Sequence, residues 1–460
     1  MTHRGRHLAD ALSPTVVRTG LGDAYRDAFA GRRLAWASPA VALVGAFIGF
    51  YVLGLLVTWG NLGPDLPIVL VAVALGLSGL LVGLGLGWSR PVSVTPEPAS
   101  GARRTGALGF ALIAIGLTAM VVYFIRIGDL PLFRPGLEQA RVDAAEEGGA
   151  ALRVLAMLAI PGCWMVVAWA VHRRHLPGLL VGAGLAVVVA VGWLLTGNRA
   201  PAFQTVEASI IVGLLAYGLI RLPPRGVVLL AVAALTLVIA AGAFGGLRLA
   251  SRATTYGPPA PNAPPPNYVR LTQIGIVGYL RVPVQNLRYT MDAVPERIGW
   301  RLGSTYLLPL VTILPGKQLT FDAQLKNALD QDYAGGGTVP GMLGESYANF
   351  GPVGWLAIPL IVAFALTLLY RRAVTAISPA WWALYGYAIV HLTGAYLSGL
   401  SIASIFPWEA YGALALPIVW PRLRGVAARL IDRRLATAQA PAGSLRPQAP
   451  PDDALLDDPR

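Results

Sequence analysis

Residues 67–88 form an unbroken apolar run, PIVLVAVALGLSGLLVGLGLGW. Crossing the hydrocarbon core of a bilayer takes about 20 such residues in a helix, so we expect this run to span a membrane. The whole chain has the same character, because 55% of its 460 residues are hydrophobic and only 13% are charged. A soluble protein of this length needs more charge to cover its surface. The sequence therefore predicts an all-α polytopic membrane protein.

Apolar runs recur along the chain and predict about ten transmembrane helices, the last of them short. The runs cover residues 37–59, 67–88, 108–127, 152–171, 179–195, 203–220, 227–246, 353–370, 381–400 and 408–420. The chain is thereby divided into an N-terminal segment (1–36), helices 1–7 (37–246), one large loop (247–352), helices 8–10 (353–421) and a tail (422–460). The tail is rich in proline and aspartate, and we expect it to be disordered.

The arginines predict the orientation. If every run spans, arginine-rich segments fall on one side of the membrane: residues 4–33, 90–104, 173–174, 221–225, 371–372 and 422–434. Short loops with excess arginine mark the cytoplasmic side of a membrane. Both termini are therefore expected on the cytoplasmic side of the plasma membrane, and the large loop on its outer side. The same pattern accounts for the formal net charge of +13 without invoking nucleic acid.

The large loop contains segments of different character. A Pro-rich stretch, Pro258–Pro266, is expected to be extended, and Ser304–Leu314 is apolar but too short to cross. Between them, Arg270, Arg281 and Arg288 share one face of a helix by spacing, and Pro283 is expected to interrupt that face.

Cations on the predicted outer face are the first candidates for chemistry. In Thr196-Gly197-Asn198-Arg199-Ala200-Pro201, Pro201 suits the first position of the next helix. A guanidinium beside free helix N–H groups would bind phosphate or pyrophosphate, although Arg199 could equally anchor a helix end.

A carboxylate and a histidine are the next candidates. Glu345 precedes the eighth span, near headgroup level, where it could cap a helix, pair with an arginine or act as a general base. His391 lies mid-span and is expected to hydrogen-bond a neighbouring helix rather than catalyse. Zinc-ligand spacing, nucleotide-binding loops and hydrolase elbows are absent from the sequence, so neither a metal nor a nucleotide cofactor is expected.

Three segments together resemble a family. Gly128-Asp129-Leu130-Pro131-Leu132-Phe133 followed by Arg141, then Gly197-Asn198-Arg199, then residues 343–351 (LGESYANFG) are similar to segments of Wzy-type oligosaccharide repeat-unit polymerases, the O-antigen polymerase family. The order of spans and the late large loop also match.

The resemblance implies a metal- and nucleotide-independent membrane glycosyltransferase of exopolysaccharide or cell-surface polysaccharide synthesis. Its substrates would be polyprenyl-pyrophosphate-linked oligosaccharides, and a chain-length regulator would be a further partner. Arg141 and Arg199 would bind the pyrophosphate and Glu345 would be catalytic. Apart from the resemblance, Arg288, Arg301, Asn349 and His391 are candidates for supporting roles. A glycan ligase that uses the same donor remains an alternative. A lipid-linked oligosaccharide flippase is another, although a flippase is expected to show internal repeats, which this sequence lacks.

Overall fold

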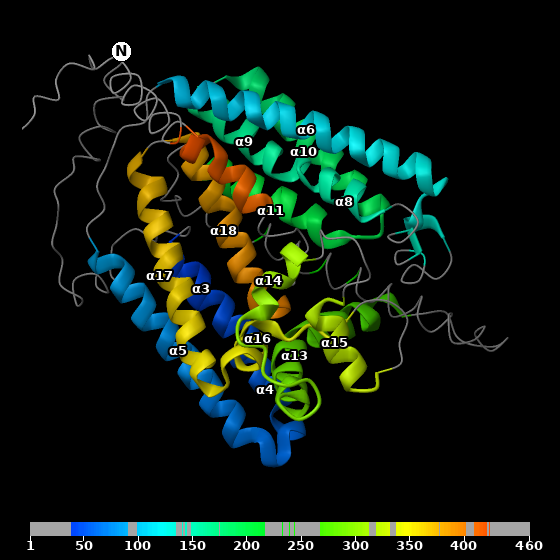
Figure 1. Ribbon diagram of the computed structural model, residues 1–460, viewed down its shortest axis with the longest axis vertical. Helices are drawn as coiled ribbons and strands as arrows, with labels where there is room; N and C mark the ends of the chain where they lie inside the picture. The colour runs from blue at the N-terminus through cyan, green and yellow to red at the C-terminus, as the bar shows by residue number, and fades with distance from the viewer. Residues whose placement is uncertain are drawn as a thin grey trace, which may run out of the picture.

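The computed structural model describes residues 38–90, 99–134, 140, 143–144, 149–173, 175–216, 232, 239, 243, 267–311, 319–331, 337–376, 378–401, 409–420 and 423. Every regular element in these ranges is a helix (Figure 1). Five helices are long and apolar enough to cross a membrane: Pro39–Ser89, Gly101–Ile127, Ala151–His172, Leu176–Leu195 and Pro352–Val374. The described chain is thus all-helical, with the several apolar spans of a polytopic membrane protein, as the sequence predicts.

Further helices cover the predicted spans at 203–220, 381–400 and 408–420 wholly or in part, but they are not among the five. The predicted span at 227–246 and the Pro-rich stretch lie outside the described residues, apart from Val232, Ile239 and Ala243.

The elements in chain order are α3 (Pro39–Phe47), the π-helix η1 (Ile48–Val52), α4 (Leu53–Leu62), the 3-10 helix η2 (Gly63–Asp65), α5 (Leu66–Ser89), α6 (Ala99–Ile127), the 3-10 helix η3 (Pro131–Phe133), α8 (Ala150–Met157), α9 (Ala159–His172), α10 (Leu176–Leu195), α11 (Arg199–Ala216), α13 (Tyr268–Ala293), α14 (Ser304–Val311), α15 (Phe321–Ala328), α16 (Gly341–Phe350), α17 (Pro352–Ala376) and α18 (Pro379–Ser398).

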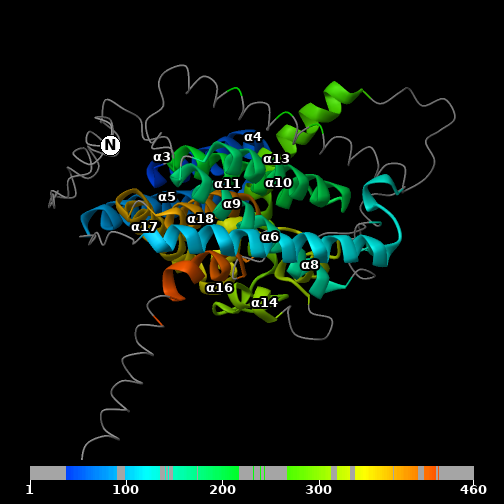
Figure 2. The same ribbon diagram turned by 90° about the horizontal axis from the view of Figure 1, so that it is seen from above.

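The long helices form two groups with α18 between them (Figures 1 and 2). In one group α5 packs along α17 and touches α3, and in the other α6, α9, α10 and α11 pack on one another. Helix α18 contacts α3 and α17 on one side and α9 and α11 on the other. It is accordingly buried along much of its length, which explains why it tolerates His391 and several tyrosines in its core.

Glycines allow α5 and α17 to meet backbone to backbone. Gly79, Gly83 and Gly87 recur every fourth residue on one face of α5. A Cβ at Gly79 would overlap the carbonyl oxygen of Leu356, and one at Gly83 would overlap that of Leu360. In lipid no hydrophobic force drives two helices together, so small residues at this spacing are commonly used to bring helix backbones into close contact. The pair therefore depends on glycine rather than on side-chain interdigitation.

Aromatic and arginine contacts tie together one end of the bundle. Arg371, near the end of α17, donates to the carbonyl oxygens of Gly87 and Trp88 at the end of α5, both at 3.0 Å. At the start of α18, the Trp382 ring lies 5.7 Å from that of His172 at the end of α9. Three predicted cytoplasmic segments therefore have an arginine at or next to this end: Arg90 after α5, Arg173 after α9 and Arg371 near the end of α17.

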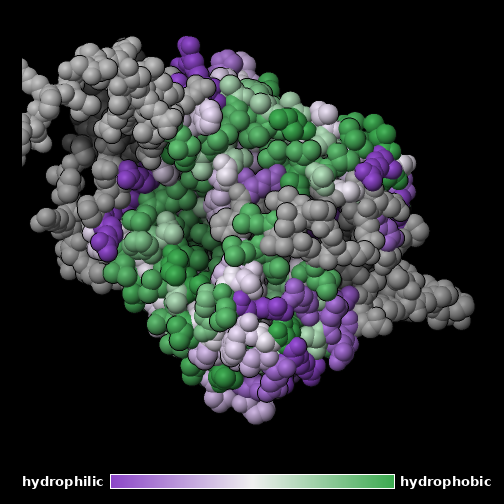
Figure 3. Space-filling view, viewed as in Figure 1, coloured by the Kyte–Doolittle hydropathy of each residue, from purple (hydrophilic) through white to green (hydrophobic). Residues whose placement is uncertain are grey.

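The opposite end carries α13 to α16. Hydrophilic side chains gather over α13 and α15 in the lower right of Figure 3, whereas the surface over the long helices is mostly hydrophobic. Helix α13 runs without a break from Tyr268 to Ala293, so the expectation that Pro283 interrupts it is wrong. Contacts with α16 on one side and α4 on the other hold the helix together across the position where Pro283 lacks an N–H.

Candidate functional site

Glu345 stands at the centre of the polar cluster at this end of the bundle. It lies in the second turn of α16, and its side chain is fully buried. Thr305 of α14 donates its hydroxyl to Oε1 at 2.8 Å. The backbone N–H groups of Leu400 and Ser401, just beyond α18, donate to Oε2 at 2.5 and 3.1 Å. Three donors from two distant segments thus converge on one carboxylate.

This geometry corrects two expectations about Glu345. Among the described residues no arginine lies within ion-pairing distance of it, and it does not cap the start of α16. Its side chain is also fully buried within the protein. Burial raises the pKa of the Glu345 carboxyl above its usual value, and the hydrogen bonds from Ser401, Thr305 and Leu400 oppose that rise.

The turn after α18 is shaped to reach this carboxylate. Gly399 has a φ of +99°, which L side chains rarely adopt, and a Cβ there would lie 2.7 Å from Oε2 of Glu345. The conformation aims the next two N–H groups at the carboxylate, while the missing side chain leaves room for it. Glycine is therefore required at residue 399 for both reasons.

Asn349 supports the cluster from one turn further along α16. Its amide nitrogen donates to the hydroxyl oxygen of Thr305 at 2.6 Å and to the backbone carbonyl of Glu345 at 2.8 Å. Its amide oxygen accepts from the N–H of Gly303 at 2.8 Å. The Thr305 hydroxyl, which accepts from Asn349, is thereby oriented to donate to Glu345, so Asn349 positions the donor.

His391 joins the same turn from the other side. Its Nε2 lies 3.2 Å from the carbonyl oxygen of Leu400, and its Nδ1 lies 3.0 Å from the hydroxyl of Tyr411 in the helix at 409–420. A carbonyl only accepts, so Nε2 carries the proton and Nδ1 accepts from Tyr411. His391 bonds a neighbouring helix, as predicted, and holds the peptide whose N–H reaches Glu345.

Arg199 begins α11 after a tight turn in which Gly197 has a φ of +77°. Its guanidinium lies 5.1 Å from the centre of the Tyr279 ring of α13, a cation–π distance. The helix starts two residues earlier than expected, so Pro201 is its third residue rather than its first. That position is tolerated because the first four N–H groups of a helix have no partner within it.

The other predicted arginines are dispersed. Arg301 donates to the Gln324 side chain at 2.5 Å, and burial lowers its pKa. Arg288 lies on α13, where its Nε is 2.6 Å from Oδ2 of Asp65 in η2. Arg141 lies outside the described residues. The structure therefore unites Glu345, Asn349 and His391 in one cluster, while Arg199 contacts α13 and Arg288 pairs with Asp65 elsewhere.

Helix geometry relates these positions along α13. At 100° per residue, Tyr279, Asn286 and Thr290 share one face of α13. Arg199 contacts that face at Tyr279, and α16 contacts it at Thr290. Asn286 donates to the carbonyl of Val339, and Thr290 packs on Gly344, the residue before Glu345. Tyr279 and Thr290 are separated by roughly 16 Å along the axis. Arg199 and Glu345 thus stand on the same side of α13.

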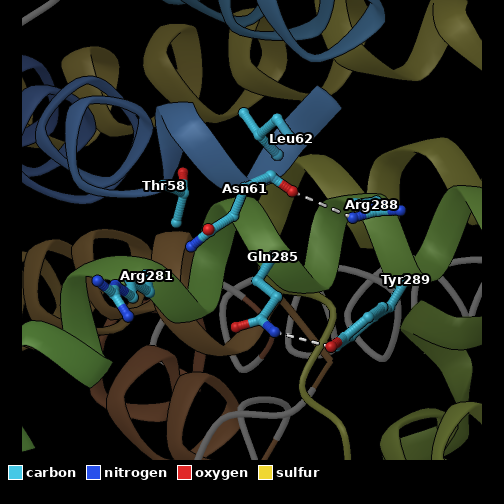
Figure 4. Close-up of a pocket in the computed structure, with 7 residues that line it drawn as sticks. All are labelled: Thr58, Asn61, Leu62, Arg281, Gln285, Arg288 and Tyr289. Atoms are coloured by element: carbon cyan, nitrogen blue, oxygen red, sulfur yellow. Dashed lines mark hydrogen bonds between the residues drawn. The ribbon is translucent and has the colours of Figure 1, made fainter. Parts of the chain in front are cut away.

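The opposite face of α13 lines a small pocket with the last turn of α4 (Figure 4). Its volume is about 240 Å³. It is lined by Thr58, Asn61, Leu62, Arg281, Gln285, Arg288 and Tyr289. The arginine stripe was readable from sequence spacing, but the contribution of α4 was not, because α4 and α13 lie more than two hundred residues apart.

Sequence reasoning also missed Thr305 and the Leu400–Ser401 peptide groups, and no sequence signal identifies them. Across the ranges that the structure covers, histidine, cysteine, aspartate and glutamate side chains do not gather in threes as metal ligands would. No protein-family model, curated protein or solved structure matches this chain.

Proposed function

We propose that this chain is a multi-pass membrane glycosyltransferase that polymerises oligosaccharide repeat units carried on polyprenyl pyrophosphate at the outer face of the plasma membrane. One observation carries the proposal: the segments that resemble the polymerases, far apart in sequence, lie at one end of the bundle. Residues 128–133 follow the end of α6, and residues 197–199 follow the end of α10. Gly192, near the end of α10, faces Met120 near the end of α6. Arg199 contacts α13, which packs on the third segment in α16.

The remainder of the predicted topology belongs to the same proposal. Ten spanning helices, two cytoplasmic termini and an extracytoplasmic loop at residues 247–352 would place this end of the bundle outside. The lipid donor and the growing chain would then meet the cluster from the outer leaflet. A chain-length regulator would contact the protein from the same side.

The proposed reaction transfers the growing chain to the next unit. The acceptor hydroxyl oxygen bonds to the anomeric carbon, and the bond from that carbon to the pyrophosphate oxygen breaks with its electron pair. Arg199, with Arg141, would stabilise the charge that develops on the pyrophosphate. The hydroxyl proton would pass to the Glu345 carboxylate, whose raised pKa makes it a stronger base than an exposed glutamate.

The full burial of Glu345 sets a condition on this mechanism. The carboxylate is fully buried and bonded by Thr305 and by the turn at Gly399–Ser401, so an acceptor hydroxyl reaches it only after surrounding groups move aside. His391 and Asn349 would act as positioning residues, because one holds the turn and the other orients Thr305. Arg288 and Arg301 would support the outer end of the bundle through Asp65 and Gln324.

The test uses purified protein in nanodiscs with a lipid-linked repeat unit, and products are separated by gel. The wild-type protein should give a ladder of chain lengths. Glu345→Gln should lower polymer formation by about a hundredfold or more, because the amide does not accept the proton. Glu296→Gln, a change of the same chemistry at an exposed residue in the large loop, should leave the ladder intact.

Other product patterns would identify the alternatives. Transfer of the glycan to a different acceptor without a ladder would indicate a ligase. Movement of intact donor across the bilayer without bond cleavage would indicate a flippase and refute the proposal.

A further inference from the structure

The pocket between α4 and α13 has its own electrostatic character. Arg281 and Arg288 are seven residues apart and point from the same face of α13. Arg288 is paired with Asp65 and also lies 3.5 Å from the carbonyl oxygen of Asn61. Arg281 is exposed, and within the described chain no hydrogen bond or ion pair engages it. Two guanidinium groups and one carboxylate leave the site with one uncompensated positive charge.

Uncharged polar groups complete the lining. Gln285 lies between the two arginines on α13 and donates to the hydroxyl of Tyr289 at 2.7 Å. Asn61 faces them from the last turn of α4, while the Thr58 hydroxyl, which also lines the pocket, donates to the carbonyl oxygen of Gly54 at 2.7 Å (Figure 4). The pocket thus offers amide and hydroxyl groups around a cationic centre. This is the composition of a site for a small oxyanion.

The position of the pocket relates it to the bilayer. Helix α4 ends the first leg of the apolar stretch Pro39–Ser89, and η2 turns the chain back into α5. Trp59, in the turn of α4 that lines the pocket, is 49% exposed, and tryptophan is enriched at the membrane–water interface. Val277 and Ile274, four and seven residues before Arg281 on the same face of α13, are also exposed. The pocket accordingly opens at the level of lipid headgroups, above an apolar helix surface.

We propose that this pocket binds the phosphate group of a membrane lipid, whose acyl or prenyl chain lies along the exposed Ile274 and Val277 of α13. The net positive charge attracts the anionic phosphate group of a lipid, and guanidinium forks bind two phosphate oxygens at once. A volume of about 240 Å³ accepts a phosphate with a small headgroup. It lies below the roughly 300–1,000 Å³ of pockets that enclose drug-sized molecules. The inference does not rest on glycosyl transfer.

Lipid binding to the full-length purified protein in detergent tests the proposal by native mass spectrometry. Phosphatidylglycerol, undecaprenyl phosphate and inorganic phosphate serve as separate probes. Arg281→Gln should weaken binding of the lipid that occupies the site at least tenfold. Arg270→Gln removes the same charge from the same face of α13, eleven residues away and outside the pocket, and should change binding less than twofold.

The probes distinguish the two lipid sources. If Arg281→Gln weakens the binding of phosphatidylglycerol, the site belongs to bulk phospholipid. If it weakens the binding of undecaprenyl phosphate alone, the site belongs to the carrier lipid. Asp65→Asn, which frees Arg288, should tighten binding. Equal losses from the Arg281 and Arg270 variants would overturn the proposal, because they would show only general charge attraction. Binding of inorganic phosphate without either lipid would overturn it as well.

Discussion

Replacing Glu345 with glutamine should remove a pH dependence from the stability of the folded protein. Burial raises the pKa of Glu345, so the folded state holds the proton more tightly than the unfolded state does. Its stabilising contribution is therefore present below the unfolded pKa of about 4.5 and is lost as the pH rises through the folded value. Glutamine is uncharged at every pH, so its contribution to the stability of the folded state does not change with pH.

The structure sets the size of the effect. Below about pH 4.5 the two proteins should differ by only about 1 kcal/mol, because glutamine still offers an acceptor to the two backbone donors. Above it, the stability of the wild type relative to the variant should fall by at most about 1.4 kcal/mol per pH unit, the limit for one proton. Glu345→Ala should be worse at every pH, because the buried Thr305 hydroxyl loses its acceptor, at about 1–3 kcal/mol, and two half-buried N–H groups lose theirs as well.

The assay is the apparent Tm in detergent, followed by intrinsic fluorescence between pH 4 and 8. The Tm of Glu345→Gln minus that of the wild type should rise with pH and then level off. Glu296→Gln, at an exposed carboxylate, supplies the baseline. A difference that stays constant across this range would refute the reasoning, since it would mean that burial does not perturb Glu345. An alanine variant as stable as the glutamine variant would contradict the hydrogen-bond network.

Three further predictions follow from the described geometry and the topology. Arg199→Ala should abolish long polymer at normal protein levels and Arg199→Lys should restore part of it, measured as chain length on gels; wild-type chains from the alanine variant would reduce Arg199 to a helix anchor. Gly83→Val should lower the apparent Tm by several degrees through overlap with α17, whereas Gly184→Val, in open space on α10, should not; equal losses would contradict the packing. A cysteine near Asn262 should react with an impermeant thiol reagent from outside and one near Thr375 should not, and the reverse pattern would reject the proposed orientation.

The coarse architecture was predictable because it depends on composition. Runs of apolar residues must form helices in lipid, and charge between them sets which ends lie together. Proline misled the prediction twice, at Pro201 and Pro283. Local propensity does not register that the first helical N–H groups need no partner, or that neighbouring helices hold a proline-containing helix together.

The site was predictable in its residue types and not in its partners. Glu345, Asn349 and His391 stood out as polar groups in apolar surroundings. The groups that bind Glu345 are a threonine forty residues before it and two peptide N–H groups beyond position 399. Backbone donors leave no trace in side-chain chemistry, so only the fold reveals them.

The close contact of α5 with α17 has a consequence for biogenesis. Helix α5 leaves the ribosome roughly 260 residues before α17 begins. At about 5–20 residues per second, translation of that interval takes roughly 13–50 s. During this time α17, the helix that packs on the Gly79–Gly83–Gly87 face of α5, has not been made, so lipid or an insertion factor must cover that face. Early synthesis therefore yields a half-built bundle whose first hairpin waits for the C-terminal third of the chain.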